Sequence, residues 1–215
     1  MTQQLEIWCG EFGRQYTDRN QVDWRTVVPL LRPMVDGLSL GRVLEVGSNR
    51  GHNLLALRHL LGEAVELIGV EPSPYAREAA RAAEVETRAG DAFALPFPDG
   101  HFDLVFTAGV LIHVALKDLP AAMREVHRCS RRYILAIEYF SEEETSIPYR
   151  GHQELLWKRD FLRHYQTLFP PLSLLRQGYL EDWDRSTWWL LEKPACGASF
   201  GRRDLGDPRG NSTPG

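Results

Sequence analysis

The sequence has few cysteines and no long apolar run. Its three cysteines, Cys9, Cys129 and Cys196, stand far apart without a C-x-x-C pair, so we expect no disulfide framework and no metal site. No stretch approaches the ~20 apolar residues that cross a membrane. The first residues, MTQQLE, lack a basic start followed by an apolar segment and predict no secretory signal. A cytoplasmic protein with no membrane partner is the expectation.

The sequence also lacks an excess of positive charge. It carries 25 lysine and arginine residues against 29 aspartate and glutamate residues, a formal net charge of −4. Proteins that hold nucleic acid by its phosphates usually have a basic excess. We therefore expect a small-molecule substrate and no nucleic-acid partner. The sequence leaves open whether the chain forms a homodimer.

The 215 residues suffice for one domain with additions at both ends. Residues 1–40 form an aromatic and polar arm, in which a helical pattern from Asp23 to Asp36 is interrupted by Pro29 and Pro33. Residues 41–193 form the main domain. Residues 194–215 contain almost nothing apolar, which predicts a disordered tail.

Short apolar runs alternate with helical patterns in the main domain. Strands are predicted at residues 42–47, 67–71, 85–88, 102–107 and 132–139, with helices at 52–61, 74–83 and 118–129. This alternation predicts a parallel sheet with helices on both faces. Runs at 172–180 and 186–192 lie too close for a crossover helix, so this pair is predicted to be antiparallel.

The loop after the first strand is the expected ligand site, because open parallel sheets bind ligands at the carboxyl ends of their strands. It reads EVGSNRG over residues 45–51, and Gly47 and Gly51 permit tight turns and a close ligand. The helix that follows offers unpaired N–H groups. Asn49 stands where a G-x-G-x-x-G dinucleotide fingerprint has its second glycine, which argues against NAD.

Two acids follow the next two strands. Glu71 ends the second strand and can accept both hydroxyls of a ribose, or it is an exposed acid before a Ser-Pro helix start. Asp91 follows the third strand and can accept from an adenine amine while the Ala92 N–H meets a ring nitrogen, or it is a turn residue. All these loops lie on one edge of the sheet, which favours a nucleoside site.

These motifs together resemble the class I S-adenosylmethionine-dependent methyltransferases. VLEVGSNRG matches the glycine-rich first motif, GVEPS the acidic second, GDAFALPFPDGHFDLVFTAGVLIHV the third and fourth strands, and TWWLLEK the seventh strand. The resemblance implies a Rossmann-like, doubly wound α/β sheet of seven strands with an antiparallel last strand, and S-adenosyl-L-methionine as cofactor. Its cofactor contacts would be Glu45, Gly47, Ser48, Asn49, Gly51, Glu71, Pro72, Asp91, Ala92 and Thr107. Glu45 would anchor the methionine end, or hydrogen-bond the loop as a buried structural acid.

The flanks carry a narrower resemblance. W-x-G-x-FG-x-x-YT-x-RN at residues 8–20, GVLIH at 109–113, YRGH at 149–152 and KRDF at 158–161 are similar to methylases associated with pseudaminic acid biosynthesis. The tail after Lys193 has no counterpart in that pattern.

Candidate residues for the chemistry lie in the arm and after the fourth and fifth strands. Methyl transfer needs mainly alignment, and a base only for a hydroxyl or charged amine acceptor. His113 and His152 are the candidate bases, each also compatible with a structural role. The expected lid and ligand contacts are Trp8, Phe12, Tyr149 and Arg150 for the substrate, and Tyr16 and Arg19 for the cofactor. Alternatively, the arm packs on the sheet and its aromatic side chains only bury apolar surface. The alternative for Arg150 is a solvated charge on the protein surface.

The sequence thus predicts methyl transfer to an oxygen or nitrogen of a polar small molecule, such as a sugar acid or a specialised-metabolism intermediate. Two alternatives stay open. One is an RNA or protein methyltransferase, against which the net acidity argues. The other is a cofactor-binding protein of the same fold without catalysis.

Overall fold

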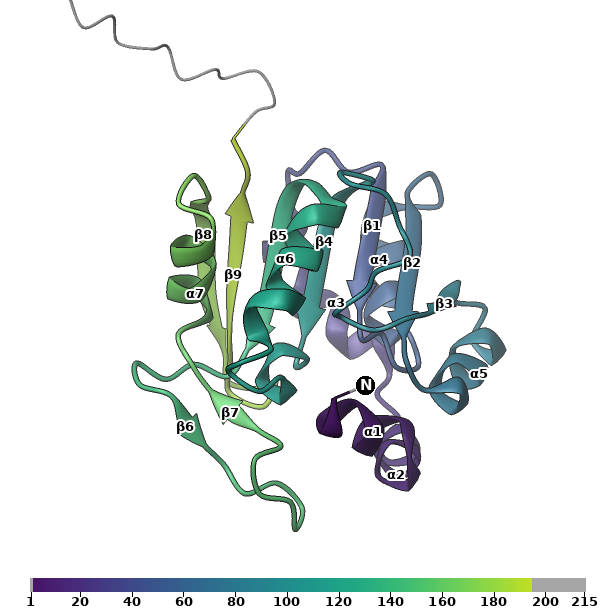
Figure 1. Cartoon of the computed structure of the whole chain (residues 1–215). Coiled ribbons are helices and arrows are strands. Elements are labelled where there is room, and N and C mark those ends of the chain that lie inside the picture. The colour runs from purple at the N-terminus through teal and green to yellow at the C-terminus, as the bar shows by residue number, and fades with distance from the viewer. Residues whose placement is uncertain (1, 195–215) are drawn as a thin grey trace, which may run out of the picture.

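A central seven-stranded sheet organises the chain in the computed structural model, which describes residues 2–194 (Figure 1). The predicted tail and Cys196 lie outside the described residues. In spatial order the strands are β3 (Thr87–Ala89), β2 (Glu66–Glu71), β1 (Arg42–Val46), β4 (Phe102–Ala108), β5 (Ser130–Glu138), β9 (Ser186–Glu192) and β8 (Ser173–Leu180). The helices are α1 (Gln3–Cys9), α2 (Glu11–Arg19), α3 (Trp24–Val35), α4 (His52–Leu61), α5 (Pro74–Ala82), the 3-10 turn η1 (Leu111–His113), α6 (Leu119–Cys129) and α7 (Phe161–Leu168).

The strand directions confirm the predicted fold class. β1 runs parallel to β2 and β4, and the pairs β2–β3 and β4–β5 are also parallel. β9 is antiparallel to both β5 and β8, so β9 alone is reversed within this sheet. The order in the sheet changes direction between β1 and β4, and loops that follow these two strands therefore border a crevice.

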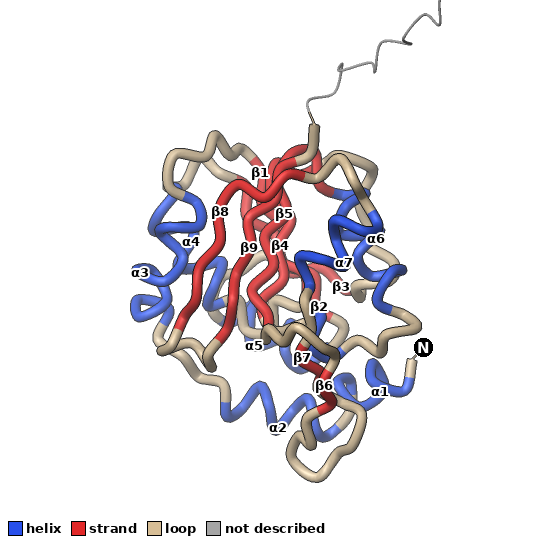
Figure 2. The backbone as a smooth tube through the Cα atoms, turned by 90° about the vertical axis from the view of Figure 1, so that its left-hand side faces the viewer, coloured by secondary structure: helices blue, strands red, loops and turns tan. Residues whose placement is uncertain are grey.

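Helices cover both faces of the sheet, α3 and α4 on one side and α6 and α7 on the other (Figure 2). Successive side chains of each strand point to opposite faces. Val43 accordingly packs in the cluster that contains α3 and α4, whereas Leu44 packs in the cluster that contains α6 and α7. The near-continuous apolar strands of the sequence are thus buried on both faces, as parallel strands are.

The predicted interruption of the first long helix is wrong. α3 continues through Pro29 and Pro33, after Asp23 caps its first turn by accepting a hydrogen bond from the backbone of Arg25 at 3.0 Å. The helix buries Leu31 and Met34 completely against the sheet side that α4 also covers. Burial of an apolar face stabilises a helix more than the loss of two backbone donors destabilises it here.

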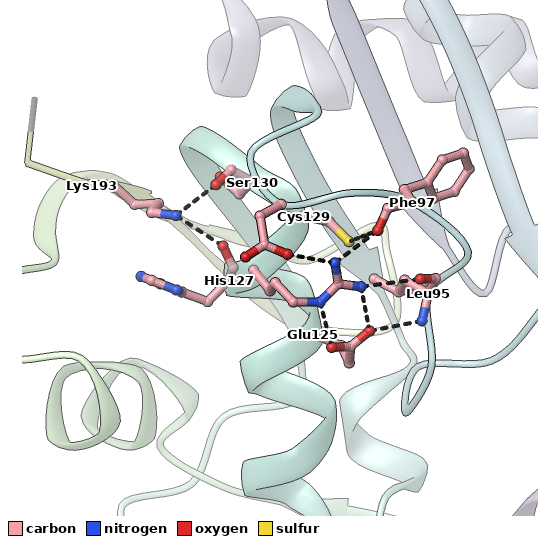
Figure 3. A network of polar contacts seen from close by, with 9 residues as sticks. Leu95, Phe97, Glu125, His127, Cys129, Ser130 and Lys193 are labelled. Carbon is pink, nitrogen blue, oxygen red and sulfur yellow. Dashed lines mark hydrogen bonds and ion pairs between the residues drawn. The ribbon is translucent and has the colours of Figure 1, made fainter. Parts of the chain in front are cut away.

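The connection from β3 to β4 is fastened to α6 by one arginine side chain (Figure 3). Arg128 donates to the carbonyls of Phe97 (2.7 Å) and Leu95 (3.1 Å) and to both carboxylate oxygens of Glu125. Nearby, Lys193 donates to the His127 and Ser130 carbonyls at the end of the helix. The Arg128 contacts hold the connection that leads into β4 against α6, and the Lys193 contacts hold the end of β9 against the end of α6.

Two additions lie at the carboxyl ends of the parallel strands. The first part of the arm, α1 and α2, lies there beneath β1, β2 and β4 in the view of Figure 1, and we call these two helices the arm from here on. A segment that we call the flap, residues 141–158, carries the small ribbon β6 (Thr145–Ser146) and β7 (Trp157–Lys158). Neither arm helix was located by the sequence pattern. None of the helices among residues 2–194 has the length and apolar character to cross a membrane.

Candidate active site

A cavity of about 400 Å³ lies between the arm and the carboxyl ends of the parallel strands. It collects most of the predicted cofactor contacts, which come from four separate segments. Those lining it are Tyr16, Glu45, Gly47, Ser48, Asn49, Glu71, Pro72, Asp91 and Ala92, together with the predicted substrate residue Trp8 and the candidate base His113. The site predicted from separate motifs is therefore one continuous space.

Glu71 joins the first two loops of this cavity. Its Oε2 accepts a hydrogen bond from the backbone N–H of Asn49 at 2.9 Å, and its Oε1 accepts one from the N–H of Ser73 at 2.9 Å. Burial raises the pKa of the carboxyl, and these two backbone bonds oppose that shift. The side chain is 8% exposed, which excludes the alternative of a solvent-exposed acid. A carboxylate has further lone pairs, which can accept from hydroxyl groups of a ligand.

The loop after β1 has a backbone that few other residues would allow. Gly47 has φ +73°, and a Cβ atom there would lie 2.5 Å from Val110. Asn49 also has a positive φ, 45°, a conformation that asparagine tolerates better than most residues. Its side-chain Oδ1 accepts from the hydroxyl of Thr17 at 3.0 Å, so the arm is tied directly to this loop.

Glu45 lies at the deepest part of the loop, 2% exposed. Its Oε1 accepts a hydrogen bond of 2.6 Å from Asn53 in the first turn of α4, and its Oε2 has no partner among the described residues. Burial raises the pKa of this carboxyl to about 8. An unpaired buried carboxylate oxygen is costly unless a donor or a cation meets it.

A smaller cavity of about 220 Å³ adjoins the first. Tyr16, Gly109 and His113 are among the residues that line both cavities. The remaining wall of the small cavity brings together Arg19 from the arm with Tyr149 and Arg150 from the flap. These residues are far apart in the sequence, and the fold places them around one space.

Residues 44–133 match a protein family described as Methyltransferase domain. This part of the chain therefore resembles methyltransferase domains, and the strand order of the sheet agrees with that resemblance. The uncharacterized methyltransferase YcgJ of Bacillus subtilis is 27% identical over 150 residues, which cover 66% of this chain and 53% of that protein. An uncharacterized methyltransferase of Schizosaccharomyces pombe is 37% identical over 103 residues, covering 42% of this chain and 36% of that protein. The chain thus spans about half the length of the first curated relative and about a third of the second.

A solved structure shares the fold of the methyltransferase domain. It is the 1,6-didemethyltoxoflavin-N1-methyltransferase of Burkholderia thailandensis with bound 1,6-didemethyltoxoflavin and S-adenosylhomocysteine, with a TM-score of 0.65 and 14% identity. The alignment covers 87% of this chain and 88% of that one. S-adenosylmethionine is the cofactor that the sequence resemblance implies for this fold.

The unpaired polar atoms of the large cavity fit this cofactor. Six buried atoms of lining residues lack partners among the described residues: Trp8 Nε1, Glu45 Oε2, Ser48 Oγ, Asn49 Nδ2, His52 Nδ1 and Asn53 Oδ1. Glu45 Oε2 is an acceptor and suits the ammonium group at the methionine end of the cofactor. Asn49 Nδ2 and Trp8 Nε1 are donors and suit the carboxylate beside that ammonium. Glu71 suits the ribose hydroxyls, and Asp91, whose Oδ1 accepts from the Phe93 N–H at 2.8 Å, borders the place for the base.

The titration of Glu45 predicts a pH-dependent stability. Its pKa is about 8 in the folded protein and 4.5 in an unfolded chain, so its contribution to stability is full below pH 4.5 and is lost as the pH rises through 8. Between about pH 7 and pH 8 we expect the free energy of unfolding to fall by about 1 kcal/mol on account of Glu45. His52 and His113, whose pKa burial lowers to about 4, are neutral in the folded protein across this window, and their residual protonation in the unfolded chain has a smaller effect of opposite sign.

Urea unfolding of the wild type and of Glu45→Gln at the two pH values measures this contribution. The variant should show a smaller decline, to which Glu138, whose pKa burial raises to about 7, still contributes. An equal decline in both proteins would show that Glu45 does not titrate there.

His113 lies at the wall shared by the two cavities. Its Nδ1 is 2.6 Å from the Leu155 carbonyl oxygen, which can only accept, so Nδ1 carries the hydrogen and Nε2 is the ring acceptor. Burial lowers the pKa of the imidazole to about 4, and the ring is therefore neutral at pH 7. Its centroid is 4.6 Å from that of Trp8. The position of His113 permits a contact with a ligand, and its low pKa makes the imidazole a weak base.

Several predicted residues line neither cavity. The side chains of His152 and Phe12 line neither cavity and instead pack edge-on against each other, with ring centroids 5.0 Å apart. The backbone of His152 exchanges two hydrogen bonds with that of Tyr149, which holds the flap together. Thr107 is fully buried within the sheet, and the neighbouring Ala108 reaches the cavities instead. A Cβ at Gly51 would lie 2.6 Å from Val85, which explains this glycine by packing.

The structure adds residues to the site that the sequence did not single out. Asn53 and His52 line the large cavity from the start of α4, and Trp183 and Asp184 line both cavities from the β8–β9 turn. The sequence could have indicated His52 and Asn53, because they begin the helix that follows the glycine loop. Nothing in the local sequence around the β8–β9 turn indicates which loops it meets. Among residues 2–194, no group of three His, Cys, Asp or Glu side chains is arranged to hold a metal ion.

Proposed function

We propose that the protein transfers a methyl group from S-adenosylmethionine to an oxygen or nitrogen of a polar small molecule. The observation that carries this proposal is the junction of the two cavities at Tyr16, Gly109 and His113. A cofactor in the large cavity and an acceptor in the small one would meet at this wall. The small volume, about 220 Å³, suits a metabolite better than a macromolecule.

The residues at the junction supply alignment and exclude water. The bound cofactor supplies a methyl group made electrophilic by its sulfonium. The aromatic rings of Trp8 and Tyr16, 5.0 Å apart in an edge-to-face contact, close the arm side of the space. Glu138 accepts hydrogen bonds from the N–H groups of Val110, Leu111 and Ile112, which fixes the segment carrying His113. Holding the acceptor atom in line with the methyl group accounts for most of the rate enhancement in such a displacement.

The polar character of the acceptor follows from the wall of the small cavity. Arg19 and Arg150 bring two positive charges to it, and three tyrosines bring hydroxyl groups. An acidic metabolite such as a sugar acid would suit these groups. The narrower likeness to methylases associated with pseudaminic acid biosynthesis remains a prediction.

A labelling experiment tests the proposed function. The protein is incubated with S-adenosylmethionine labelled in the methyl group and a cell extract separated into small-molecule, RNA and protein fractions. We expect label in the small-molecule fraction, with Glu71→Ala as the matched blank. Label in RNA or protein would favour a macromolecular acceptor. Calorimetric binding of the cofactor with no transfer to any fraction would favour a binding protein without catalysis.

A further inference from the structure

The turn between β8 and β9 brings a carboxylate to the junction of the two cavities. Asp184 lines both cavities. It and Arg185 form a tight turn closed by a 2.9 Å hydrogen bond from the Ser186 N–H to the Trp183 carbonyl. Both turn residues have positive φ, 48° and 56°, where hairpin turns usually carry asparagine or glycine. Strained positions of this kind concentrate at functional sites.

The surroundings of Asp184 leave its charge available to a ligand. Among residues 2–194, no lysine or arginine forms an ion pair with it, and the adjacent Arg185 pairs with Glu181 at 3.3 Å. Two tyrosines of the small cavity lie close to the carboxylate. Burial, the negative charge of Asp184 and a side-chain hydrogen bond with Asp184 raise the pKa of Tyr139, and burial, Tyr149 and Asp184 raise that of Tyr16. Both phenols therefore stay protonated and can donate hydrogen bonds.

The same small cavity contains two arginines without acidic partners. Arg19 lies over the ring of Tyr16 and Arg150 over the ring of Tyr149, each 6.0 Å from the centroid. Within the described part of the chain neither guanidinium forms an ion pair with a carboxylate. The cavity thus holds two positive groups and one negative group, and none of them neutralises another in a bonded pair.

We propose that the acceptor is amphoteric: Arg19 and Arg150 bind its anionic group, and Asp184 binds a hydrogen-bearing nitrogen or oxygen, preferably an amine. This rests on the proposed function, because Asp184 lines both the small cavity and the proposed cofactor cavity. Asp184 is then a specificity-determining residue of the acceptor site. A ligand with only one of the two charges leaves one side of the cavity unpaired.

Binding of three related probes tests the proposal without a known substrate. They are para-aminomethylbenzoate, which has both charges, para-methylbenzoate, which has only the anion, and para-aminomethylbenzamide, which has only the cation. Each is titrated by ligand-observed NMR with S-adenosylhomocysteine saturating. In the wild type we expect the first probe to bind about tenfold more tightly than either of the others.

The variants assign each preference to its residue. Asp184→Asn keeps the turn, because asparagine favours the same backbone, and should weaken the two amine-bearing probes about tenfold while para-methylbenzoate is unchanged. Replacing Arg19 and Arg150 with alanine should weaken the two carboxylates instead. Glu181→Gln removes an exposed carboxylate of the same hairpin that lines neither cavity, and should change nothing.

Three results would overturn the proposal: no advantage of the amphoteric probe in the wild type, equal weakening of all three probes by Asp184→Asn, or no binding of any probe. Calorimetry of S-adenosylmethionine binding separates this failure from that of the proposed function. A wild type that binds the cofactor but does not discriminate the probes refutes the amphoteric acceptor alone. A folded wild type that does not bind the cofactor refutes the proposed function itself.

Discussion

Replacing Glu71 with alanine should lower the affinity for S-adenosylmethionine about 100-fold. The wild-type carboxylate offers charged acceptors to the ribose hydroxyls and also holds the N–H groups of Asn49 and Ser73. The substitution removes both the ligand contacts and the bonds that shape two loops of the cavity. Calorimetric titration of the two proteins with the cofactor measures the difference.

The start of the same strand provides a matched control. Glu66 is exposed and lies at the opposite end of β2 from the cavity, so Glu66→Ala should bind the cofactor like the wild type. Circular dichroism and thermal unfolding show whether Glu71→Ala is folded at the temperature of the titration. A folded Glu71→Ala that binds nearly as tightly as the wild type would remove Glu71 from the cofactor site.

The sheet and its cofactor loops could be predicted because their signals are local. The mostly apolar run from Arg42 to Val46 and the glycines after it predict a strand and a turn without reference to the rest of the chain. Ser73 before Pro74 predicts a helix start, and the structure confirms it with Ser73 as the cap. Once strands and helices alternate, the rules of parallel sheets place these loops on one edge.

The acceptor side could not be predicted in the same way, because it depends on contacts between distant segments. The sequence marks Arg19 and Tyr149 as unusual but contains no signal that they share a cavity. Nothing in the sequence around Asp184 indicates a ligand contact. Its place follows from the strand order, in which β9 inserts between β5 and β8 and turns its loop towards the cofactor edge.

The closure of the site depends on a few polar contacts made by the arm and the flap. Thr17 binds Asn49 of the glycine loop, and Asp18 accepts a hydrogen bond of 2.6 Å from Tyr75 on α5. On the flap side, Arg159 is 1% exposed, pairs with Glu144 and donates to the Val114 carbonyl at 2.8 Å. Both additions are therefore fastened to segments that line the large cavity or directly follow them.

Replacing Glu138 with alanine should lower the free energy of unfolding by about 3–5 kcal/mol. This carboxylate is fully buried at the end of β5 and accepts hydrogen bonds from three consecutive N–H groups, those of Val110, Leu111 and Ile112, at 3.1–3.3 Å. Alanine would leave the three donors buried without an acceptor, and each such donor costs about 1–3 kcal/mol. Urea unfolding at constant pH measures the loss.

Two further variants show whether the three hydrogen bonds are the cause. Glu138→Gln keeps the side-chain volume and one acceptor oxygen, so we expect about half of the loss. Glu192→Ala removes a carboxylate from the end of the neighbouring strand β9, where it pairs with the exposed Arg132, and should cost less than about 1 kcal/mol. If Glu138→Ala were no more destabilising than Glu192→Ala, the segment carrying His113 would be held by its apolar packing. The order of the acceptor wall would then not depend on Glu138.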